Sequence, residues 1–210
     1  AQTIVELITR RLPKTYGANI INRLQIITPS RKGAAGTESI NAMLQAATNP
    51  EGKGKSEKKF RDVVFRAGDR VMQTKNNYQI EWSTTSGEFG FGVFNGDIGV
   101  IESIDNENEI LTVCFDDKRC DYEFSMLEEL EHAYAITVHK SQGSEYPIVV
   151  IPLYRYTPKL LTRNLFYTAI TRAQQMVILV GNGEVADMMT DNNRQTKRYT
   201  GLGYFMTQYD

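Results

Sequence analysis

The sequence has no long hydrophobic run, and little in it suggests a leader or an anchor. Its longest apolar stretch, residues 148–153, is far shorter than the roughly 18 residues that a membrane-spanning helix needs. The amino terminus shows no basic segment followed by an apolar one, which is the pattern of a secretory signal. These absences argue against membrane insertion and secretion and favour a cytoplasmic protein.

Cysteine and histidine are also scarce, with two of each in the chain. Cys114 and Cys120 flank a short charged segment, and their spacing matches no zinc-binding pattern. We therefore expect two reduced thiols on a pair of neighbouring strands and no bound metal.

Neither sign of charge dominates the whole chain, because 24 basic and 25 acidic residues give a net charge of −1. The distribution is uneven. Residues 66–130 hold five basic and 14 acidic residues, a net charge of −9, and the remainder is therefore at +8. This asymmetry predicts two regions with different partners. The basic region is suited to phosphates, whereas the acidic middle is a poor phosphate-binding surface.

Apolar runs and helical patterns alternate on both sides of that acidic middle. Continuous apolar strands between helices are typical of a mainly parallel sheet with helices on both faces, so the predicted fold class is α/β. Pro13 and Gly17 are expected to end the first helix. Strands are predicted at about residues 24–28, 133–138, 148–151 and 176–180, and helices at 3–12, 37–47 and 161–173.

The pattern changes at residue 66. Short strand patterns are separated by turn signals such as Asn95-Gly96-Asp97, which predicts a small β barrel over residues 66–130. The barrel would be inserted into one discontinuous α/β domain made of residues 1–65 and 131–210. The polar run 51–59 is expected to be an exposed linker, and residues 82–91 a loop or hairpin tip.

Aromatic residues of the barrel region allow two interpretations. They could stack on the bases of a single strand, or they could fill the barrel core and an exposed loop. The net charge of −9 favours the second interpretation. The residues concerned are Tyr78, Trp82, Phe89, Phe91 and Phe94.

Two polar segments adjoin the predicted strands of the α/β domain. The first is AYAITVHKSQGSEY at residues 133–146, and the second is NLFYTAITRA at residues 164–173. Ligands of open α/β sheets bind beyond the carboxyl ends of strands, and Arg172 is suited to stabilising charge on a transferring phosphoryl group. Periodicity alone leaves open that these are ordinary polar residues at strand ends.

These segments resemble motifs V and VI of superfamily 1 helicases of the RecD/TraA type, which include the exodeoxyribonuclease V alpha subunit. QIITPSRKG at residues 25–33 resembles their motif IV region. GDRVMQ at 68–73, Asn77-Tyr78 and FNGDIG at 94–99 resemble their inserted SH3-like domain. The landmarks occur in the family's order over residues 20–181, so the resemblance implies a second RecA-like motor domain with an SH3-like insert.

The resemblance also implies roles for individual residues. Arg172 matches the arginine finger of motif VI, and Arg31 is a second candidate for the nucleotide. Gln142, Gly143 and Glu145 match positions on the nucleotide side, with Gln142 suited to coupling the two sites. Residues nearer the DNA backbone are Thr137, His139, Lys140 and Ser141. His139 alone also fits a structural hydrogen-bonding role.

A complete motor needs a phosphate loop, G-x-x-x-x-G-K-[ST], which this sequence lacks. Gly54-Lys55-Ser56 has Asn49 where the first glycine should stand, and no Asp-Glu pair follows an apolar strand. We therefore expect ATP and Mg²⁺ to bind mainly to an absent N-terminal RecA-like domain. We expect the chain to be an excised piece of a longer parent and to be inactive alone.

The expected function is the C-terminal motor half of an ATP-dependent 5′–3′ DNA helicase of recombination and repair. Its partners would be single-stranded DNA, the N-terminal RecA-like domain and nuclease or helicase subunits. The alternative is a non-catalytic module that docks DNA or such a partner. A nuclease is disfavoured because no carboxylate cluster suits two metals. The basic tail with Arg194, Lys197 and Arg198 resembles the family's closing helix, either solvated or facing DNA.

Overall fold

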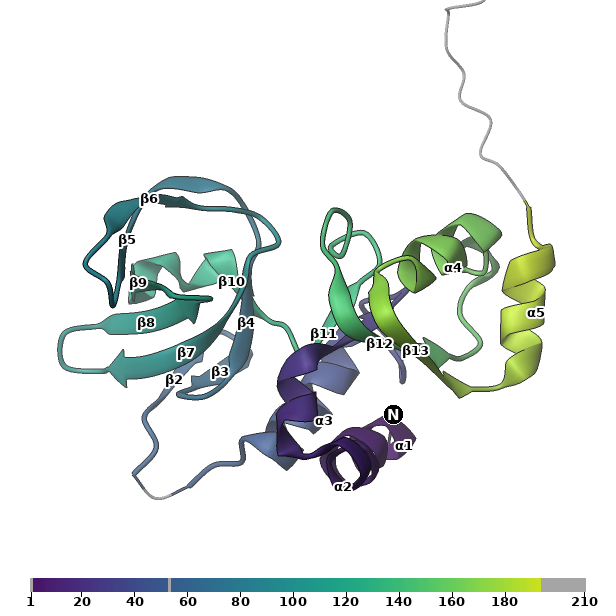
Figure 1. The fold of residues 1–210 in the computed structure, drawn as a ribbon. Helices are drawn as coiled ribbons and strands as arrows, with labels where there is room; N and C mark the ends of the chain where they lie inside the picture. The colour runs from purple at the N-terminus through teal and green to yellow at the C-terminus, as the bar shows by residue number, and fades with distance from the viewer. Residues whose placement is uncertain (1, 53, 194–210) are drawn as a thin grey trace, which may run out of the picture.

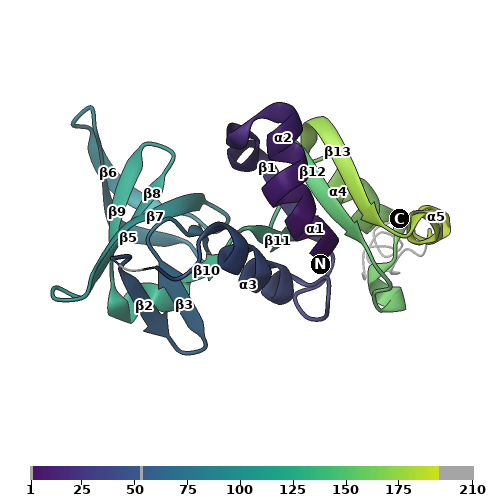
Figure 2. The same ribbon diagram turned by 90° about the horizontal axis from the view of Figure 1, so that it is seen from below.

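The computed structural model describes residues 2–52 and 54–193, in which two large sheets lie side by side and a two-stranded hairpin sheet accompanies the second (Figure 1, Figure 2). One sheet is parallel and carries helices, and the other is antiparallel and strongly curved. The basic tail residues Arg194, Lys197 and Arg198 lie outside the described residues.

The parallel sheet has four strands in the order β11-β1-β12-β13, and every neighbouring pair is parallel. Helices cover both of its faces, as its apolar strands require. Along β12, Ile148 and Val150 pack towards α1, α2 and α3, whereas Val149 and Ile151 pack towards α4 and α5. The elements are β1 (Leu24–Thr28), β11 (Ala135–Thr137), β12 (Tyr146–Leu153), β13 (Ala173–Gly181), α1 (Gln2–Glu6), α2 (Leu12–Tyr16), α3 (Thr37–Thr48), α4 (Arg163–Ile170) and α5 (Gly183–Asp191), with 3-10 turns at Ala18–Arg23 and Pro158–Leu160.

The antiparallel sheet has seven strands in the order β10-β4-β7-β8-β9-β5-β6. Its buried core is centred on Leu111, Val113, Tyr122 and Leu127, and the hairpin β2–β3 adds Phe65 to that core. We call this unit the barrel. Its elements are β2 (Glu57–Phe60), β3 (Val63–Arg66), β4 (Arg70–Gln73), β5 (Asn77–Thr84), β6 (Phe89–Val93), β7 (Ile98–Asp105), β8 (Ile110–Phe115), β9 (Lys118–Glu123), a 3-10 turn (Phe124–Glu129) and β10 (Leu130–His132). The predicted fold class is thus confirmed.

The first helical segment continues past the residue that was expected to end it. A π-helical turn over Leu7–Arg11 joins α1 to α2, and Pro13 lies in the first turn of α2. In the wider turn the Leu12 N–H donates to Leu7 O, five residues back. Pro13, which has no N–H to donate, then stands in the first turn of α2, where a helix tolerates proline. The segment ends at Gly17, whose φ is 87°.

Three further local predictions were wrong in part. Residues 57–59, expected in a linker, belong to β2, and Trp82 and Phe89–Phe91 lie in paired strands rather than a loop. The helix expected over 161–173 is limited to α4. The expectation for the thiols is confirmed, because free Cys114 and free Cys120 lie on the neighbouring strands β8 and β9.

A buried carboxylate joins the barrel to the parallel-sheet domain. Asp69, fully buried just before β4, accepts hydrogen bonds from Gln45 and Asn49 of α3 and from Tyr134, and it lies 3.1 Å from His132 Nε2. Burial by itself raises the pKa of Asp69, but the hydrogen bonds from His132 and Asn49 outweigh it and hold the pKa below its usual value. We call these five residues the Asp69 junction.

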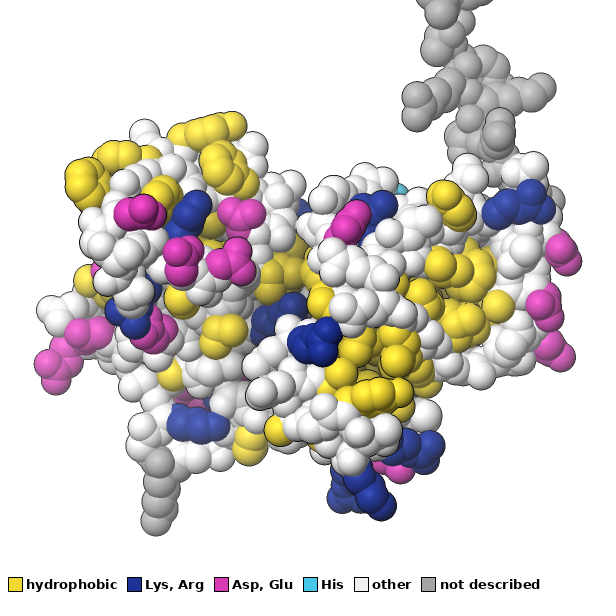
Figure 3. Space-filling model, in the orientation of Figure 1, with side chains coloured by type: hydrophobic (Ala, Val, Ile, Leu, Met, Phe, Trp, Pro, Cys, Tyr) yellow, Lys and Arg dark blue, Asp and Glu magenta, His cyan; other side chains and the backbone are white. Residues whose placement is uncertain are grey.

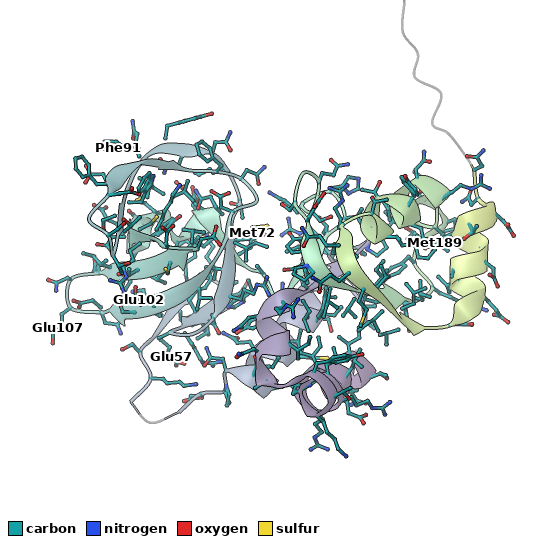
Figure 4. All side chains as sticks on the ribbon, viewed as in Figure 1. Glu57, Met72, Phe91, Glu102, Glu107 and Met189 are labelled. Carbon is teal, nitrogen blue, oxygen red and sulfur yellow. The ribbon has the colours of Figure 1, made fainter. Side chains whose placement is uncertain are left out.

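Two neighbours of Asp69 in sequence extend the contact between the units. The Arg70 guanidinium donates to Leu24 O at 2.9 Å, across from β4 to the start of β1. Met72 of the same strand lies between the two units and packs into the core of the parallel-sheet domain (Figure 4). The two units are therefore joined by packed and hydrogen-bonded contacts.

Candidate functional site

The loop of residues 138–145, here named the connecting loop, leaves the carboxyl end of β11 and returns to the start of β12. Because these strands are parallel, the loop runs from the edge of the sheet where the carboxyl ends of the strands lie to the opposite edge, where their amino ends lie. Ser141 holds its turn: Ser141 Oγ donates to Val138 O at 2.8 Å and its N–H donates to Thr137 O at 3.1 Å. Ser141 is fully buried, so its predicted contact with DNA is corrected to a role in shaping the loop.

Arg172 meets the far end of the connecting loop. The Thr162 side chain caps α4 at its start, and Arg172 lies between the end of α4 and the first residue of β13. The half-buried guanidinium donates to Ser144 O at 3.2 Å and to Thr168 O at 3.3 Å. The backbone N–H of Tyr146 donates to Arg172 O at 2.8 Å, which fixes the arginine against the loop.

The guanidinium of Arg172 has only neutral oxygen partners. In residues 2–52 and 54–193 no carboxylate lies at ion-pair distance from it. Its positive charge is therefore not neutralised within the described chain. A fixed guanidinium in this state is suited to bind a phosphate, with which it can form paired hydrogen bonds.

Three other predicted nucleotide residues lie at the same end of the connecting loop. Glu145 is exposed and accepts a hydrogen bond from Gln174 Nε2 at 3.2 Å. Gly143 has a φ of 86° with open space around it, a backbone conformation that suits glycine. Gln142 is exposed beside it. The structure thus brings Arg172, Glu145 and Gly143 to one edge of the sheet.

The near end of the connecting loop faces the barrel. His139 is exposed, and Thr137 is half-buried with its Oγ1 accepting from the Lys140 N–H at 3.3 Å. Lys140 Nζ donates to Thr74 O at 3.0 Å and to Asn95 Oδ1 at 2.6 Å, both in the barrel. We call this contact the Lys140 tether. In this conformation the ammonium group binds the barrel, so the structure gives Lys140 a second role beside the predicted DNA contact.

Arg31 lies elsewhere. It follows the carboxyl end of β1, whereas Arg172 precedes the amino end of β13, so the parallel strands place the two arginines at opposite edges of the sheet. Arg31 also forms an ion pair with Glu131, with 2.9 Å between Nη2 and Oε1. The structure therefore does not bring Arg31 to Arg172, and a carboxylate already neutralises its charge.

Asn95 and Asp69 were not singled out from the sequence as contact residues. Both belong to segments that resemble the family's insert. Asn95 was noted there as part of the turn Asn95-Gly96-Asp97, and neither side chain was assigned a partner. A signal was present in each case, since an aspartate after glycine at a strand start and an asparagine in a tight turn both present polar atoms to neighbours. Their partners, however, are distant in sequence.

The described part of the chain offers neither a metal cluster nor a membrane-spanning helix. No group of three or more histidine, cysteine or acidic side chains there is arranged to hold a metal ion. No helix in the same part is both long and apolar enough to cross a membrane.

Comparison with known proteins places this arrangement in a class. The model of the UvrD-like helicase C-terminal domain matches residues 132–180, which contain the connecting loop and Arg172. The crystal structure of Pif1 helicase from Bacteroides in complex with ADP-AlF3 and ssDNA shares the fold, with a TM-score of 0.52 and 18% identity over 99% of this chain and 49% of that chain. The fold and these matches place the chain among proteins similar to superfamily 1 helicases.

The family follows from the barrel and from the curated relatives. The SH3 domain model of ATP-dependent RecD-like DNA helicases matches residues 40–115. The ATP-dependent RecD2 DNA helicase of Deinococcus radiodurans is 34% identical over 174 residues, covering 83% of this chain and 22% of that protein. The RecBCD enzyme subunit RecD of Mycolicibacterium smegmatis is 36% identical over 118 residues, covering 56% of this chain and 20% of that protein. The chain belongs to the RecD-like helicases and spans about a fifth of the length of these relatives.

Proposed function

We propose that this chain is the second motor domain, with its inserted barrel, of an ATP-dependent DNA helicase that acts in recombination and repair. Residues 1–65 and 131–210 would form the motor domain and residues 66–130 the insert, with the hairpin β2–β3 packed on the insert. The single observation that carries the proposal is the guanidinium of Arg172, held by carbonyl oxygens next to Glu145 and, among residues 2–52 and 54–193, without a carboxylate partner.

Arg172 is the proposed arginine finger. When ATP is bound between this domain and a preceding one, its γ-phosphoryl group is transferred to water. The guanidinium binds the phosphoryl oxygens and stabilises the charge that develops on them. Gln142, Gly143 and Glu145 border the same space and would position the nucleotide against Arg172.

The other end of the connecting loop is the proposed DNA side. His139 is exposed there and Thr137 is half-buried, and both lie beyond the carboxyl end of β11, where open α/β sheets bind ligands. The loop is only eight residues long and joins both ends of the site. A change in the strand contact at His139 would therefore be transmitted to Arg172 through one short, hydrogen-bonded segment.

The proposal includes inactivity of this chain alone. The sequence contains no phosphate loop and no Asp-Glu pair after an apolar strand, so the ATP phosphates and Mg²⁺ would be bound mainly by a preceding RecA-like domain. Arg172 stabilises a transition state that the preceding domain has to assemble. The expected partners are that domain, single-stranded DNA and, as the name of the mycobacterial relative suggests, subunits of a helicase–nuclease complex. Translocation would run 5′ to 3′.

The decisive experiment substitutes Arg172→Ala in the longer parent protein and measures ATP hydrolysis with single-stranded DNA present. Loss of an arginine finger lowers the turnover rate by about 10³–10⁵-fold, while affinity for the strand should stay within a few fold. Arg155→Ala, which removes an exposed arginine from the segment after β12, is the matched control and should retain activity. Unchanged turnover in Arg172→Ala would remove the assignment and favour a non-catalytic binding module.

A further inference from the structure

The strand β6 forms an unprotected edge of the barrel. It stands at the end of the seven-stranded sheet and pairs with β5 alone, so its outer N–H and C=O groups have no ladder partner within the described residues. Its sequence, FGFGV, contains no charge and no proline. Phe89 is 83% exposed and Phe91 is 62% exposed. Proteins usually protect an exposed edge strand with charges, proline or a covering segment.

The alternation of phenylalanine and glycine in β6 determines which side chains point outward. A Cβ added at Gly90 would lie 2.5 Å from the Trp82 ring, and one at Gly92 would lie 3.2 Å from the Phe94 ring. The glycines therefore let the strand lie directly on these rings. Successive residues of a strand face opposite sides, so Phe89 and Phe91 point away, and Phe91 projects from the barrel in Figure 4.

An open groove runs beside this edge, with a volume of about 830 Å³. Its apolar wall includes Trp82, Phe91 and Met126, and hydrophobic side chains gather over β5 and β6 with acidic groups next to them (Figure 3). The combination of an apolar wall and an unpaired strand is suited to an extended chain, which adds a strand and places alternate side chains in pockets.

The charge of the groove identifies the kind of chain. Three carboxylates line it, those of Glu81, Asp121 and Glu123. The lining cation Arg119 already forms an ion pair with Glu102 at 2.7 Å, and Lys118 Nζ lies 4.4 Å from the centre of the Trp82 ring, so the carboxylates still outnumber the cations. Sites for single-stranded nucleic acid combine stacking rings with a positive groove. Here the rings stand among net negative charge, which repels a phosphate backbone and attracts lysine and arginine.

We propose that β6 is a docking site for an extended, basic and apolar segment of a partner protein, which pairs with β6 as an eighth strand. The main-chain groups of the added strand form hydrogen bonds with the unpaired N–H and C=O groups of β6. Its apolar side chains contact Phe89 and Phe91, and its cations face Glu81 and Glu123. This surface is separate from Arg172 and from the connecting loop, so the docking does not depend on the motor activity.

The test uses the fluorescence of Trp82, the single tryptophan of the chain, which lines the groove. The probe is a synthetic seven-residue peptide in which lysine and valine alternate along one face of the extended strand, with threonine at the intervening positions, because Glu81 and its cross-strand neighbour Phe91 lie on the same face of the sheet. A saturable change in Trp82 fluorescence is expected with this peptide. A glutamate–valine peptide should give none. The lysine–valine peptide with N-methyl groups along one edge should bind at least tenfold more weakly, because it cannot form the strand ladder.

Variants locate the binding. Phe89→Ser with Phe91→Ser, and separately Glu81→Lys, should each weaken peptide binding at least tenfold. Tyr16→Ser, which removes a 54% exposed aromatic side chain from α2, should leave it unchanged. Unfolding midpoints of the variants establish that each one is folded. Equal binding of the N-methylated peptide would overturn strand addition. Saturation of the Trp82 signal by oligo-dT but not by the peptide would overturn the proposal and assign the groove to a nucleic-acid strand.

Discussion

The Asp69 junction and the connecting loop both join the parallel sheet to other parts of the chain, yet they satisfy their polar groups in opposite ways. At the junction, a fully buried carboxylate receives its bonds from inside the protein: from α3 and the residue that follows it, from the backbone N–H of Arg66, and from the chain that returns from the barrel. In the connecting loop, Gln142 and Glu145 are exposed, and the adjoining Arg172 has no carboxylate partner in the part of the chain that the structure describes. Polar groups that are hydrogen-bonded within the protein support its stability, whereas polar groups that lack such partners at a sheet edge are available to a ligand.

The largest effect on stability is expected at the junction. Asp69→Ala removes the acceptor of four side chains and leaves their buried donors without a partner. The free energy of unfolding should fall by about 3 kcal/mol. Urea unfolding at pH 7 measures this loss, with the exposed Asp187→Ala on α5 as the control, which should change it by less than about 0.5 kcal/mol. Equal stability of the two variants would contradict the structural role of the junction.

The pH dependence of stability sharpens the same comparison. Because the folded pKa of Asp69 lies below its unfolded value, the unfolded chain binds the proton more tightly than the folded one. The stability that Asp69 contributes is therefore complete above the unfolded pKa of about 3.9 and is lost as pH falls through the lower folded pKa. Asp69→Asn should be less stable at pH 7 and should lose less stability between pH 5 and pH 3. An identical acid dependence in both proteins would remove Asp69 as the cause.

A smaller effect is expected at the Lys140 tether, which is more exposed than the junction. Lys140→Ala and Asn95→Ala should each lower the free energy of unfolding by about 1 kcal/mol or less. A double-mutant cycle tests whether the two side chains act as a pair, and the combined loss should be smaller than the sum of the single losses. Strictly additive losses would show that no tether exists. If the substitutions lower only the affinity of the longer protein for single-stranded DNA, Lys140 would be assigned to the DNA contact instead.

Most of the fold could be predicted because its signals are local. The continuous apolar run of β12 predicts a strand buried on both faces, and helices do cover both. Predictions from local sequence failed where a neighbouring segment altered the backbone structure that a residue adopts. Pro13 ends an ordinary helix, but a π-helical turn precedes it here. The Ser/Thr-rich stretch after Trp82 suggested a loop or hairpin tip. The tip is limited to residues 85–88, because pairing of β5 with both β6 and β9 keeps Ser83 and Thr84 in the sheet.

The candidate site was predictable in part for a similar reason. The motif residues predict which side chains lie together at the connecting loop, and the structure places Arg172 beside Ser144 and Glu145. The partners that change the interpretation are distant in sequence. Lys140 and Asn95 are separated by 45 residues, and Gln45 and Asp69 by 24 residues. Arg31 was placed with Arg172 by resemblance alone, and only strand direction reveals that they occupy opposite edges.

The most direct test of the account is ATP hydrolysis by this purified chain, measured with and without oligo-dT. We predict no turnover above background in either condition, because in the proposed function Arg172 and the connecting loop supply only one side of a nucleotide site, and the sequence contains no phosphate loop. Turnover that oligo-dT stimulates and that Arg172→Ala abolishes would contradict the account, because the chain would then assemble a complete ATP site by itself.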